Sequence, residues 1–325
     1  MRKLSTSLKL RRPPNAAANT IKKIKNLFAT IRPSTTVNLH FSFQLNGPPH
    51  LGTLFSLTSL FAIAQMLEEK GLKPKIFINI LENAPAKIFT ISNRKYAINF
   101  SHLRVNGEPL IKRYLKPYQF IFELLAKSTN IKQSSLLWYS ELQATPAFRK
   151  RLIYMLEHYE SFSKVLSPYD NRLKIRIPCP HCGLLSKDSK AIKIKKLGTN
   201  KYLLSSNCPY HGVHTTLLST TNKDLVDVNT IIRNVIKESI FIEKAQSTGA
   251  ANAMIEGSDW MYIVPLIEKG LGLLGHNVLE FPIRVFTPLV VDKTGAKLSK
   301  HIHVKGGYPE YSDFINHIGE EPWKF

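Results

Sequence analysis

Four residues of this chain are spaced as the ligands of a metal ion. Cys179 and Cys182 stand in the segment CPHCG, and Cys208 and His211 stand in the segment CPYHG. Three thiols and an imidazole on two tight turns form a ligand set that zinc takes in tetrahedral sites, and the glycine after each pair permits the unusual backbone of such a turn. The spacing therefore predicts a zinc site.

This zinc site should be structural. A complete set of four ligands leaves no open position for a substrate or a reacting water. His181 and His214 are alternatives to His211 as the fourth ligand, and the residues between the two ligand pairs look like a short hairpin. The competing interpretation is three unrelated buried cysteines, although all three cysteines of the chain fall in this segment.

A second candidate site lies nearer the N-terminus. The segment Pro49-His50-Leu51-Gly52-Thr53 stands between a predicted strand and a predicted helix. Backbone amides and the helix dipole can hold a phosphate at such a place. An imidazole there can donate to a phosphoryl oxygen as charge develops, and a glycine lets a nucleotide approach closely. The competing interpretation is a turn histidine without any function.

A third candidate segment follows an apolar stretch near the other end of the chain. Residues 292–301 read DKTGAKLSKH. Lys297 and Lys300 could neutralise a triphosphate, and the hydroxyl of Ser299 could hydrogen-bond to it. An exposed basic turn is the alternative in so basic a chain.

These segments need a scaffold that brings them together. Residues 36–45 alternate in polarity and are rich in β-branched and aromatic side chains, which predicts a strand. An apolar helix over 54–70 and a strand over 75–80 complete a βαβ unit of a parallel sheet. Further strands are predicted over 253–257 and 284–291. We expect an α/β fold with a Rossmann-like parallel sheet that carries an inserted helical and zinc-ribbon subdomain.

Composition and pattern divide the chain into four parts. We expect a basic N-terminal tail over 1–32, the first half of the core over 33–108, a helical insertion over 109–225 with its zinc ribbon at 173–220, and the second half of the core over 226–325. At 325 residues the chain is long enough to bury two such cores.

The two phosphate-binding candidates together resemble the signatures of the class I aminoacyl-tRNA synthetases. In that family an HIGH motif follows the first strand of a Rossmann-like core and a KMSKS loop follows the last. Here the corresponding segments read HLGT at 50–53 and KLSKH at 297–301, in the same order and in the same predicted contexts. Between them, Gly257-Ser-Asp259-Trp is similar to a G-x-D-H motif of the family. The resemblance covers roughly residues 36–318.

The resemblance implies amino-acid activation by ATP, with Mg²⁺ bound to the nucleotide. It assigns His50 to the α- or β-phosphate, Gly52 to the space for adenine, and Asp259 to the ribose or the substrate amine. Lys297 and Lys300 would hold the leaving pyrophosphate. The remaining ATP-binding positions that it implies are Pro49, Thr53 and Ser299.

Three positions depart from the family pattern, namely Thr53, Trp260 and His301. A zinc knuckle in the connective region is similar to that of the lysyl, methionyl and glutamyl-like members, and it favours the class I lysyl type, with lysine as the amino acid. The residues after His301 are too few for an anticodon-binding domain. The chain is therefore expected to be a free-standing catalytic core, similar in outline to glutamyl-queuosine tRNA synthetases, although its first-strand motif matches theirs poorly.

The charge of the chain predicts a polyanionic partner. Lysine and arginine number 45 against 23 aspartate and glutamate, so the formal net charge is +22. tRNA or another RNA is the expected partner. Residues 33–67 carry no charge, but polar residues and prolines interrupt them, so we predict no contact with a membrane. The expected phosphate contacts are Lys22, Lys23, Lys25, Arg149, Lys150 and Arg151.

The basic tail over 1–32 has three interpretations. It is a solvated tail, an arm that contacts phosphates, or an organelle transit peptide, which is also rich in arginine and serine and poor in acid. Three cysteines cannot form a disulfide framework, which argues against a secreted, disulfide-stapled fold. We expect a cytoplasmic protein, with the transit peptide as the alternative.

Two other classes of function stay open. Thr53, Trp260 and His301 suit a catalytically silent synthetase-like module that binds RNA or a partner protein. A biosynthetic amino-acid ligase or a nucleotidylyltransferase could use the same geometry without tRNA. The zinc insert and the lysine-rich segment 292–301 argue against the nucleotidylyltransferase.

Overall fold

The core of the protein is a five-stranded parallel sheet. The structure is a computed structural model, and it describes residues 21–45, 49, 51–105, 108–131 and 134–291. The sheet has the order β15-β14-β1-β2-β7. Numbered along the chain, this order is 3-2-1-4-5 read from β7, as in a Rossmann-like half, so the predicted fold class is confirmed. The strands are β1 (Thr36–Phe43), β2 (Lys73–Ile80), β7 (Ser134–Trp138), β14 (Ala251–Gly257) and β15 (Ile283–Thr287).

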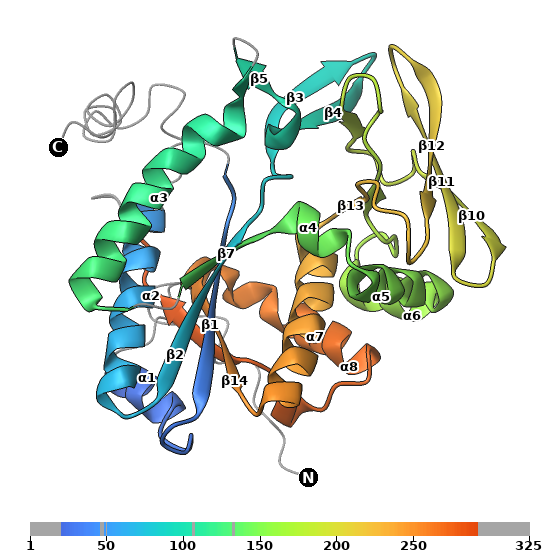
Figure 1. Ribbon diagram of the computed structural model, residues 1–325. Coiled ribbons are helices and arrows are strands. Elements are labelled where there is room, and N and C mark those ends of the chain that lie inside the picture. Colours follow the sequence, from blue (N-terminus) through green and yellow to red (C-terminus); the bar gives the residue numbers. More distant parts are fainter. Residues whose placement is uncertain (1–20, 46–48, 50, 106–107, 132–133, 292–325) are drawn as a thin grey trace.

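Helices cover both faces of this sheet (Figure 1). One face packs against α2 and α3, and the other packs against α7, which contacts α8. The short α1 lies at the amino end of β1. The helices are α1 (Ile21–Leu27), α2 (Leu51–Glu69), α3 (Leu110–Thr129), α7 (Thr230–Thr248) and α8 (Val264–Leu273).

Strand β1 is the centre of the sheet. It pairs in parallel with β2 on one side and with β14 on the other, so that Asn38 lies between Lys75 and Asn252. Its side chains alternate between the two faces of the sheet. Leu39 and Phe41 join the apolar core under α2, whereas His40 lies on the face covered by α7.

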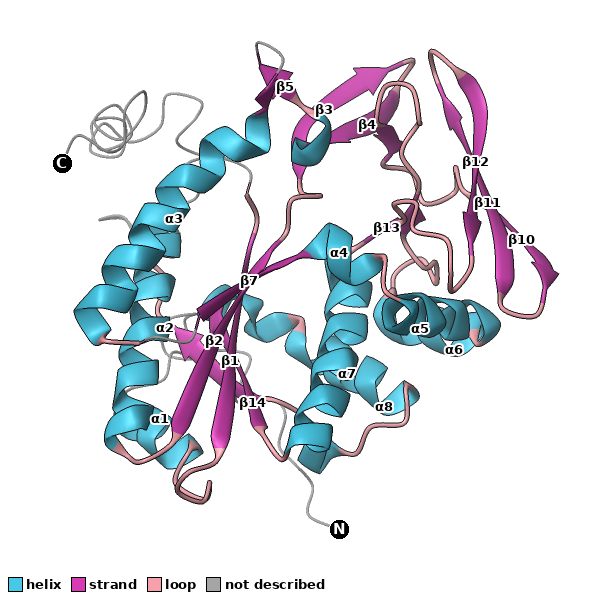
Figure 2. Cartoon of the chain, viewed as in Figure 1, coloured by secondary structure: helices cyan, strands magenta, loops and turns pink. Residues whose placement is uncertain are grey.

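Smaller sheets and helices follow the carboxyl ends of β2 and β7 (Figure 2). The first is a three-stranded sheet of β3, β4 and β9, and the second is the three-stranded ribbon β10-β11-β12. The bounds are β3 (Pro85–Ile91), β4 (Arg94–Asn99), β5 (Arg104–Val105), β6 (Glu108–Pro109), β8 (Ile175–Arg176), β9 (Leu184–Ser186), β10 (Lys193–Gly198), β11 (Lys201–Cys208), β12 (Gly212–Leu218) and β13 (Asp227–Val228). The helices are α4 (Tyr139–Gln143), α5 (Pro146–Glu157) and α6 (Tyr159–Leu166), with short 3-10 turns at Phe100–His102, Ser258–Tyr262 and Val278–Glu280.

The expected boundary at residue 109 differs from the structure. Helix α3 packs its Tyr118 and Phe122 into the apolar core under the sheet, and β7 pairs with β2 from Ile76↔Ser134 to Ile80↔Trp138. The segment Leu110–Trp138 therefore completes the first half of the core, and the helical insertion begins only after β7. An apolar stripe at helical spacing is the same for a crossover helix and an inserted one, which explains the difference. The last strand also ends at Thr287, earlier than expected.

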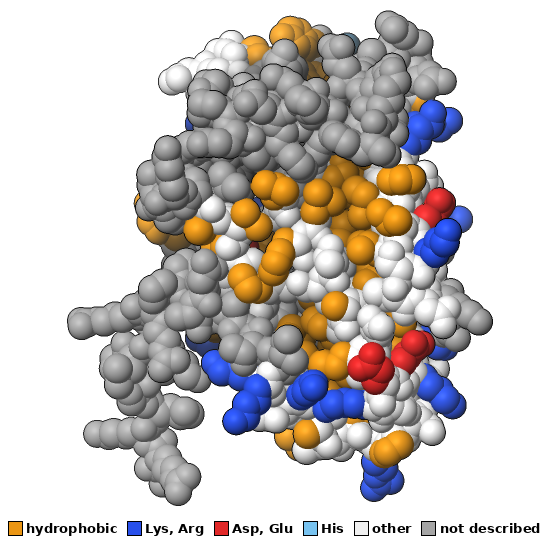
Figure 3. All heavy atoms as spheres, turned by 90° about the vertical axis from the view of Figure 1, so that its left-hand side faces the viewer, with side chains coloured by type: hydrophobic (Ala, Val, Ile, Leu, Met, Phe, Trp, Pro, Cys, Tyr) orange, Lys and Arg blue, Asp and Glu red, His pale blue; other side chains and the backbone are white. Residues whose placement is uncertain are grey.

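Helix α2 is long and apolar enough to cross a membrane by length and composition alone, a test that the core helix of a soluble protein also passes. Seven of its side chains are buried, and it contacts four strands of the sheet. Figure 3 shows the side of the molecule over α2 and α3, where exposed apolar side chains gather. Phe55 of α2 and Phe120 and Leu124 of α3 are large apolar side chains that are exposed.

Candidate active site and metal centre

The segment after β1 and the segment after β14 lie at one edge of the sheet. Pro49 is buried, and Gly52 and Thr53 lie in the first turn of α2. Asp259 lies in the 3-10 turn that follows β14. Strands β1 and β14 are neighbours, and their chain connections leave in opposite directions, which is where ligands bind in open α/β sheets. The structure therefore brings Pro49, Gly52, Thr53 and Asp259 to the same edge.

The glycine at the end of β14 makes room for this aspartate. A Cβ atom at Gly257 would lie 2.5 Å from the Oδ1 atom of Asp259, which is closer than real Cβ contacts. The backbone of Gly257 is extended (φ −64°), which any residue can adopt, so a larger side chain here would act by displacing the Asp259 carboxylate. Ser258, between them, is fully buried.

The end of β15 reaches the same edge. The Ser56 Oγ of α2 lies 3.1 Å from the Thr287 Oγ1, and the Thr287 hydroxyl donates to the carbonyl oxygen of Glu256 at 3.3 Å. These bonds join the start of α2 to the ends of β14 and β15. The chain leaves β15 towards residues 292–301. His50, Lys297, Ser299 and Lys300 lie outside the described residues, so their predicted roles stay predictions.

Sequence reasoning missed a group of charged side chains beneath this edge, between α7 and the sheet. The Lys237 ammonium donates to the Ser42 Oγ at 2.7 Å, and Lys237 is 1% exposed. Burial lowers the pKa of Lys237 to about 8, which the carboxylate of Glu238 opposes. The polar residues that alternate along β1 could have indicated a polar face of the sheet, but the side chains that bind them come from α7, which is distant in the sequence.

Arg284 of β15 is the second member of this group. It pairs with Glu238 at 2.6 Å and with Glu256 at 3.4 Å. Burial would lower the pKa of Arg284, but the two carboxylates raise it above its usual value. Burial raises the pKa of Glu256, and Arg284 opposes that shift. Ion pairs therefore hold α7 to β14 and β15 on this face of the sheet.

The four predicted zinc ligands converge. The thiol or ring nitrogen atoms of Cys179, Cys182, Cys208 and His211 all lie within 4.8 Å of one another. The Sγ atoms of Cys182 and Cys208 are 3.5 Å apart, and the His211 Nδ1 is 3.6 Å from Cys179 Sγ and 3.5 Å from Cys208 Sγ. Ligand atoms of a tetrahedral zinc with bonds of about 2.0–2.3 Å are about 3.3–3.8 Å apart. The cluster is compatible with zinc.

The two turns that carry the ligands explain the glycines after them. Gly183 (φ +72°) and Gly212 (φ +70°) adopt the left-handed conformation that favours glycine. The alternative ligand His214 lies on the inner side of the ribbon, where its Nε2 is 3.4 Å from the carbonyl oxygen of Ile177. At Cys179 burial raises the thiol pKa, but bonds from the backbone N–H groups of Cys182 and His181 offset this and leave the pKa below its usual value.

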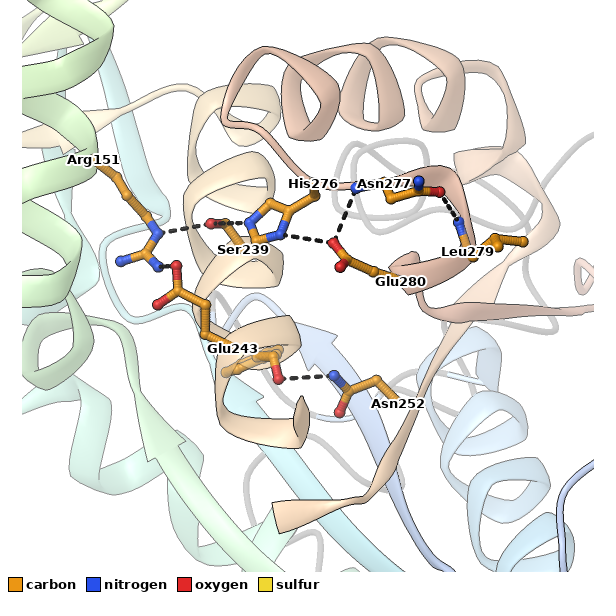
Figure 4. Close-up of polar contacts among 9 residues, drawn as sticks. Arg151, Ser239, Glu243, Asn252, His276, Asn277, Leu279 and Glu280 are labelled. Carbon is orange, nitrogen blue, oxygen red and sulfur yellow. Dashed lines mark hydrogen bonds and ion pairs between the residues drawn. The ribbon is translucent and has the colours of Figure 1, made fainter. Parts of the chain in front are cut away.

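A serine, a histidine and a glutamate elsewhere are arranged like a hydrolytic triad (Figure 4). The Ser239 Oγ lies 2.6 Å from the His276 Nε2, and the His276 Nδ1 lies 3.5 Å from the Glu280 Oε2. Ser239 is 1% exposed within α7, and its oxygen accepts from the Arg151 Nε at 2.7 Å. A buried nucleophile with an occupied lone pair cannot reach a substrate, so these bonds tie α5 to α7 and to the segment after α8.

The structure corrects two of the expected phosphate contacts. Arg149 is 0% exposed and donates to Gln143 and to the carbonyl oxygen of Asp224. Arg151 is largely buried and pairs with Glu243. Lys150 of the same helix is exposed, as are Lys22, Lys23 and Lys25. Charge along a sequence does not reveal which face of a helix packs inward, which explains the error.

Comparisons with known proteins find no matching family model and no matching curated protein. Among solved structures, a protein assigned as arginyl-tRNA synthetase from Campylobacter jejuni is 11% identical with a TM-score of 0.38, and 94% of this chain aligns with 66% of it. The Thermus thermophilus arginyl-tRNA synthetase is 12% identical with a TM-score of 0.38, and 97% of this chain aligns with 64% of it. The Plasmodium falciparum arginyl-tRNA synthetase is 10% identical with a TM-score of 0.35, and 91% of this chain aligns with 51% of it.

The chain thus spans about two-thirds or less of the length of these three structures. At these identities and TM-scores they carry no conclusion about activity or substrate, and they give the expectation of lysine no support. The fold class rests on the strand order of the sheet itself.

Proposed function

We propose that this protein activates an amino acid with ATP, as the resemblance to class I aminoacyl-tRNA synthetases implies. The observation that carries the proposal is the meeting of Pro49, Gly52 and Thr53 with Asp259 at one edge of the sheet, where this kind of sheet binds nucleotides. In the sequence the HLGT segment follows β1 and the KLSKH segment follows β15, although His50 and residues 297–301 lie outside the described residues.

The reaction needs positioning and charge more than covalent chemistry. The amino-acid carboxylate attacks the α-phosphorus of ATP, the bond to the bridging oxygen breaks, and pyrophosphate leaves with its electron pair, together with Mg²⁺. In this scheme His50 donates to a phosphate oxygen, and Gly52 admits the adenine. Asp259 binds the ribose or the substrate amine, and Lys297 and Lys300 neutralise the pyrophosphate, with Pro49, Thr53 and Ser299 as further contacts to ATP.

The acceptor of the activated amino acid is proposed to be tRNA or another RNA, because the chain carries a net charge of +22. The identity of the amino acid is left to experiment. The similarity of the zinc insert to lysyl-type members is the reason for considering lysine. A cytoplasmic location is proposed on the same sequence grounds as before.

The first test is ATP–pyrophosphate exchange with each of the twenty amino acids, with and without total tRNA. Exchange that depends on one amino acid would establish activation. Lys300→Ala should then lower the exchange rate about 10²-fold or more, as expected for the loss of one preorganised charge. Lys269→Ala, at an exposed position of α8, is the control and should leave the rate unchanged. An unchanged rate in Lys300→Ala would falsify the assignment.

We propose that zinc at the Cys/His cluster is structural. His211→Gln should weaken zinc binding at least about tenfold, because even outer-shell changes at zinc sites cost that much. His214→Gln is the matched control and should keep the metal, since His214 contacts a backbone carbonyl instead. Zinc content after dialysis against a chelator measures both variants. Equal loss from the two would contradict this ligand set.

A silent synthetase-like module is the second candidate function. Trp260, where the resemblance expects histidine, and the departures at Thr53 and His301 favour it. RNA binding by folded, zinc-loaded protein without exchange for any amino acid would support it. Exchange that ignores all RNA would instead favour a biosynthetic amino-acid ligase.

A further inference from the structure

We propose that the outward face of the ribbon β10-β11-β12 is the surface on which this protein binds RNA. The inference deepens the proposed function by locating its RNA partner, and it rests on that function for the kind of nucleic acid. The ribbon lies at the right-hand margin of Figure 1, beside α5 and α6.

Strand pairing separates an inner and an outer face of the ribbon. Tyr202, Leu204 and Leu218 are buried and belong to the core that also contains α5 and α6. Side chains alternate along each strand, so the neighbouring residues of the strands point outward. Paired across the three strands, these outward rows are Lys193 with Ser205 and Thr215, Lys195 with Leu203 and Leu217, and Asn207 with Val213.

The charge of this face has one sign. Residues 189–222 contain no aspartate or glutamate, and their five lysines are Lys190, Lys193, Lys195, Lys196 and Lys201. Lys196 points to the inner side, where it pairs with Glu157 at 3.6 Å and lies 6.0 Å from the centre of the Tyr202 ring. Lys193 and Lys195 are exposed, and neither has an ion pair with a described residue. Two unpaired cations about 7 Å apart along one strand suit successive phosphates of a polyanion.

The groups between the lysines favour RNA over an anionic membrane. Ser205, Thr215 and Asn207 offer hydroxyl and amide groups that can bond phosphates and the ribose 2′-hydroxyl. The turn that joins β11 and β12 carries Tyr210, which is 68% exposed and can stack on an unpaired base. Arg149 is buried, and Arg151 is largely buried and paired with Glu243, so Lys150 is the exposed one of the three basic residues expected on α5.

The test compares two double variants that remove the same charge at the same spacing. Lys193→Ala with Lys195→Ala changes the outward face of the ribbon. Lys73→Ala with Lys75→Ala is the matched control, because these lysines are also exposed and two residues apart on a strand, at the amino end of β2. The probe is fluorescein-labelled total tRNA, and anisotropy measures its affinity for the full chain at several salt concentrations.

We expect the ribbon variant to bind tRNA about tenfold more weakly at low salt, and its plot of log affinity against log salt to be shallower by about 2. Tyr210→Ala should weaken binding by about tenfold with little change in that slope. Equal losses in the ribbon variant and the control, or no tRNA binding by the unmodified chain, would overturn the inference. So would preferential binding to phosphatidylserine vesicles that the ribbon variant abolishes while its tRNA affinity is unchanged.

ATP–pyrophosphate exchange without RNA separates this inference from the proposed function. The ribbon variant should exchange as fast as the unmodified chain if activation occurs. A chain that binds tRNA through the ribbon but never exchanges would retain the inference and remove the proposed function.

Discussion

The two faces of the parallel sheet are built from different chemistry. Under α2 and α3, the sheet presents Leu39, Phe41, Ile78 and other apolar side chains that are almost wholly buried. Under α7, the same strands present Asn38, His40 and Ser42, together with glutamate and arginine side chains. Parallel sheets covered on both sides are usually apolar on both faces, so the polar face is the exception.

The difference indicates that the apolar face contributes mainly to stability, whereas the polar face constrains how α7 packs against the strands. Apolar packing is tolerant of shape changes, whereas a buried ion or amide has few partners that satisfy it. On the polar face the Asn252 side chain donates to the Phe241 carbonyl oxygen at 2.8 Å, and its oxygen lies 3.2 Å from the Asn38 Nδ2 and 3.3 Å from the His40 Nε2. We infer that these contacts fix the register of α7 against β1 and β14.

Arg284→Met should give the largest loss of stability, about 3–5 kcal/mol at pH 8, because it leaves Glu238 and Glu256 buried without their cation. Burial raises the pKa of Glu256 and Arg284 opposes that shift, so in the variant the folded pKa of Glu256 would lie further above the unfolded value of about 4.3. Stability from such groups is present at low pH and is lost as pH rises, so the loss should be smaller at pH 5. Urea unfolding at both pH values measures it.

Glu238→Gln added to Arg284→Met is the matched test of that explanation. It removes one of the uncompensated charges and should recover part of the lost free energy of unfolding at pH 8. Equal losses at pH 5 and pH 8, with no recovery in the double variant, would show that the ions of the polar face do not behave differently from apolar packing.

Leu57→Ala should cost about 2–5 kcal/mol on the apolar face, because it opens a cavity under α2, where Leu57 is fully buried. This cost should be the same at pH 5 and pH 8, in contrast to Arg284→Met. Ser59→Ala, on the exposed side of the same helix, is the control and should change stability by no more than about 0.5 kcal/mol. A pH-dependent loss of stability in Leu57→Ala would contradict the proposed difference between the two faces of the sheet.

His40→Phe should give the smallest effect, a change in pH dependence of about 2 kcal/mol or less between pH 7 and pH 5. Burial lowers the pKa of His40 to about 3, with Lys237 adding to the shift. Its contribution is present above pH 6.5 and is lost as pH falls towards 3. Phenylalanine keeps the stacking on Phe77 and Phe241 but removes the titration. Unfolding curves that fall as steeply with acid as those of the unmodified chain would argue against this origin.

The sequence predicts those features that depend on neighbouring residues. The alternation over 36–45 predicted β1, and the ligand pairs around Cys182 and Cys208 predicted the cluster, because each pair lies on a single turn. The βαβ unit after β1 followed for the same reason, and with it the parallel sheet.

Contacts between distant residues gave no such signal. The pairing of Arg284 with Glu238 joins residues that lie on a strand and a helix 46 positions apart. Nothing in the local pattern separated α3, a core helix, from the helices of the insertion, and nothing showed that Arg149 points inward. The roles of His50 and Lys300 rest on the resemblance and stay predictions.

The position of β1 in the middle of the sheet has a consequence for synthesis. Its partner Asn252 follows Asn38 by 214 positions. At about 5–20 residues per second on the ribosome, β1 therefore waits for about 10–40 seconds as an unpaired edge before β14 emerges. Exposed strand edges invite pairing with other chains. The central strand of the finished sheet is thus an open edge for most of the time that the chain is being made.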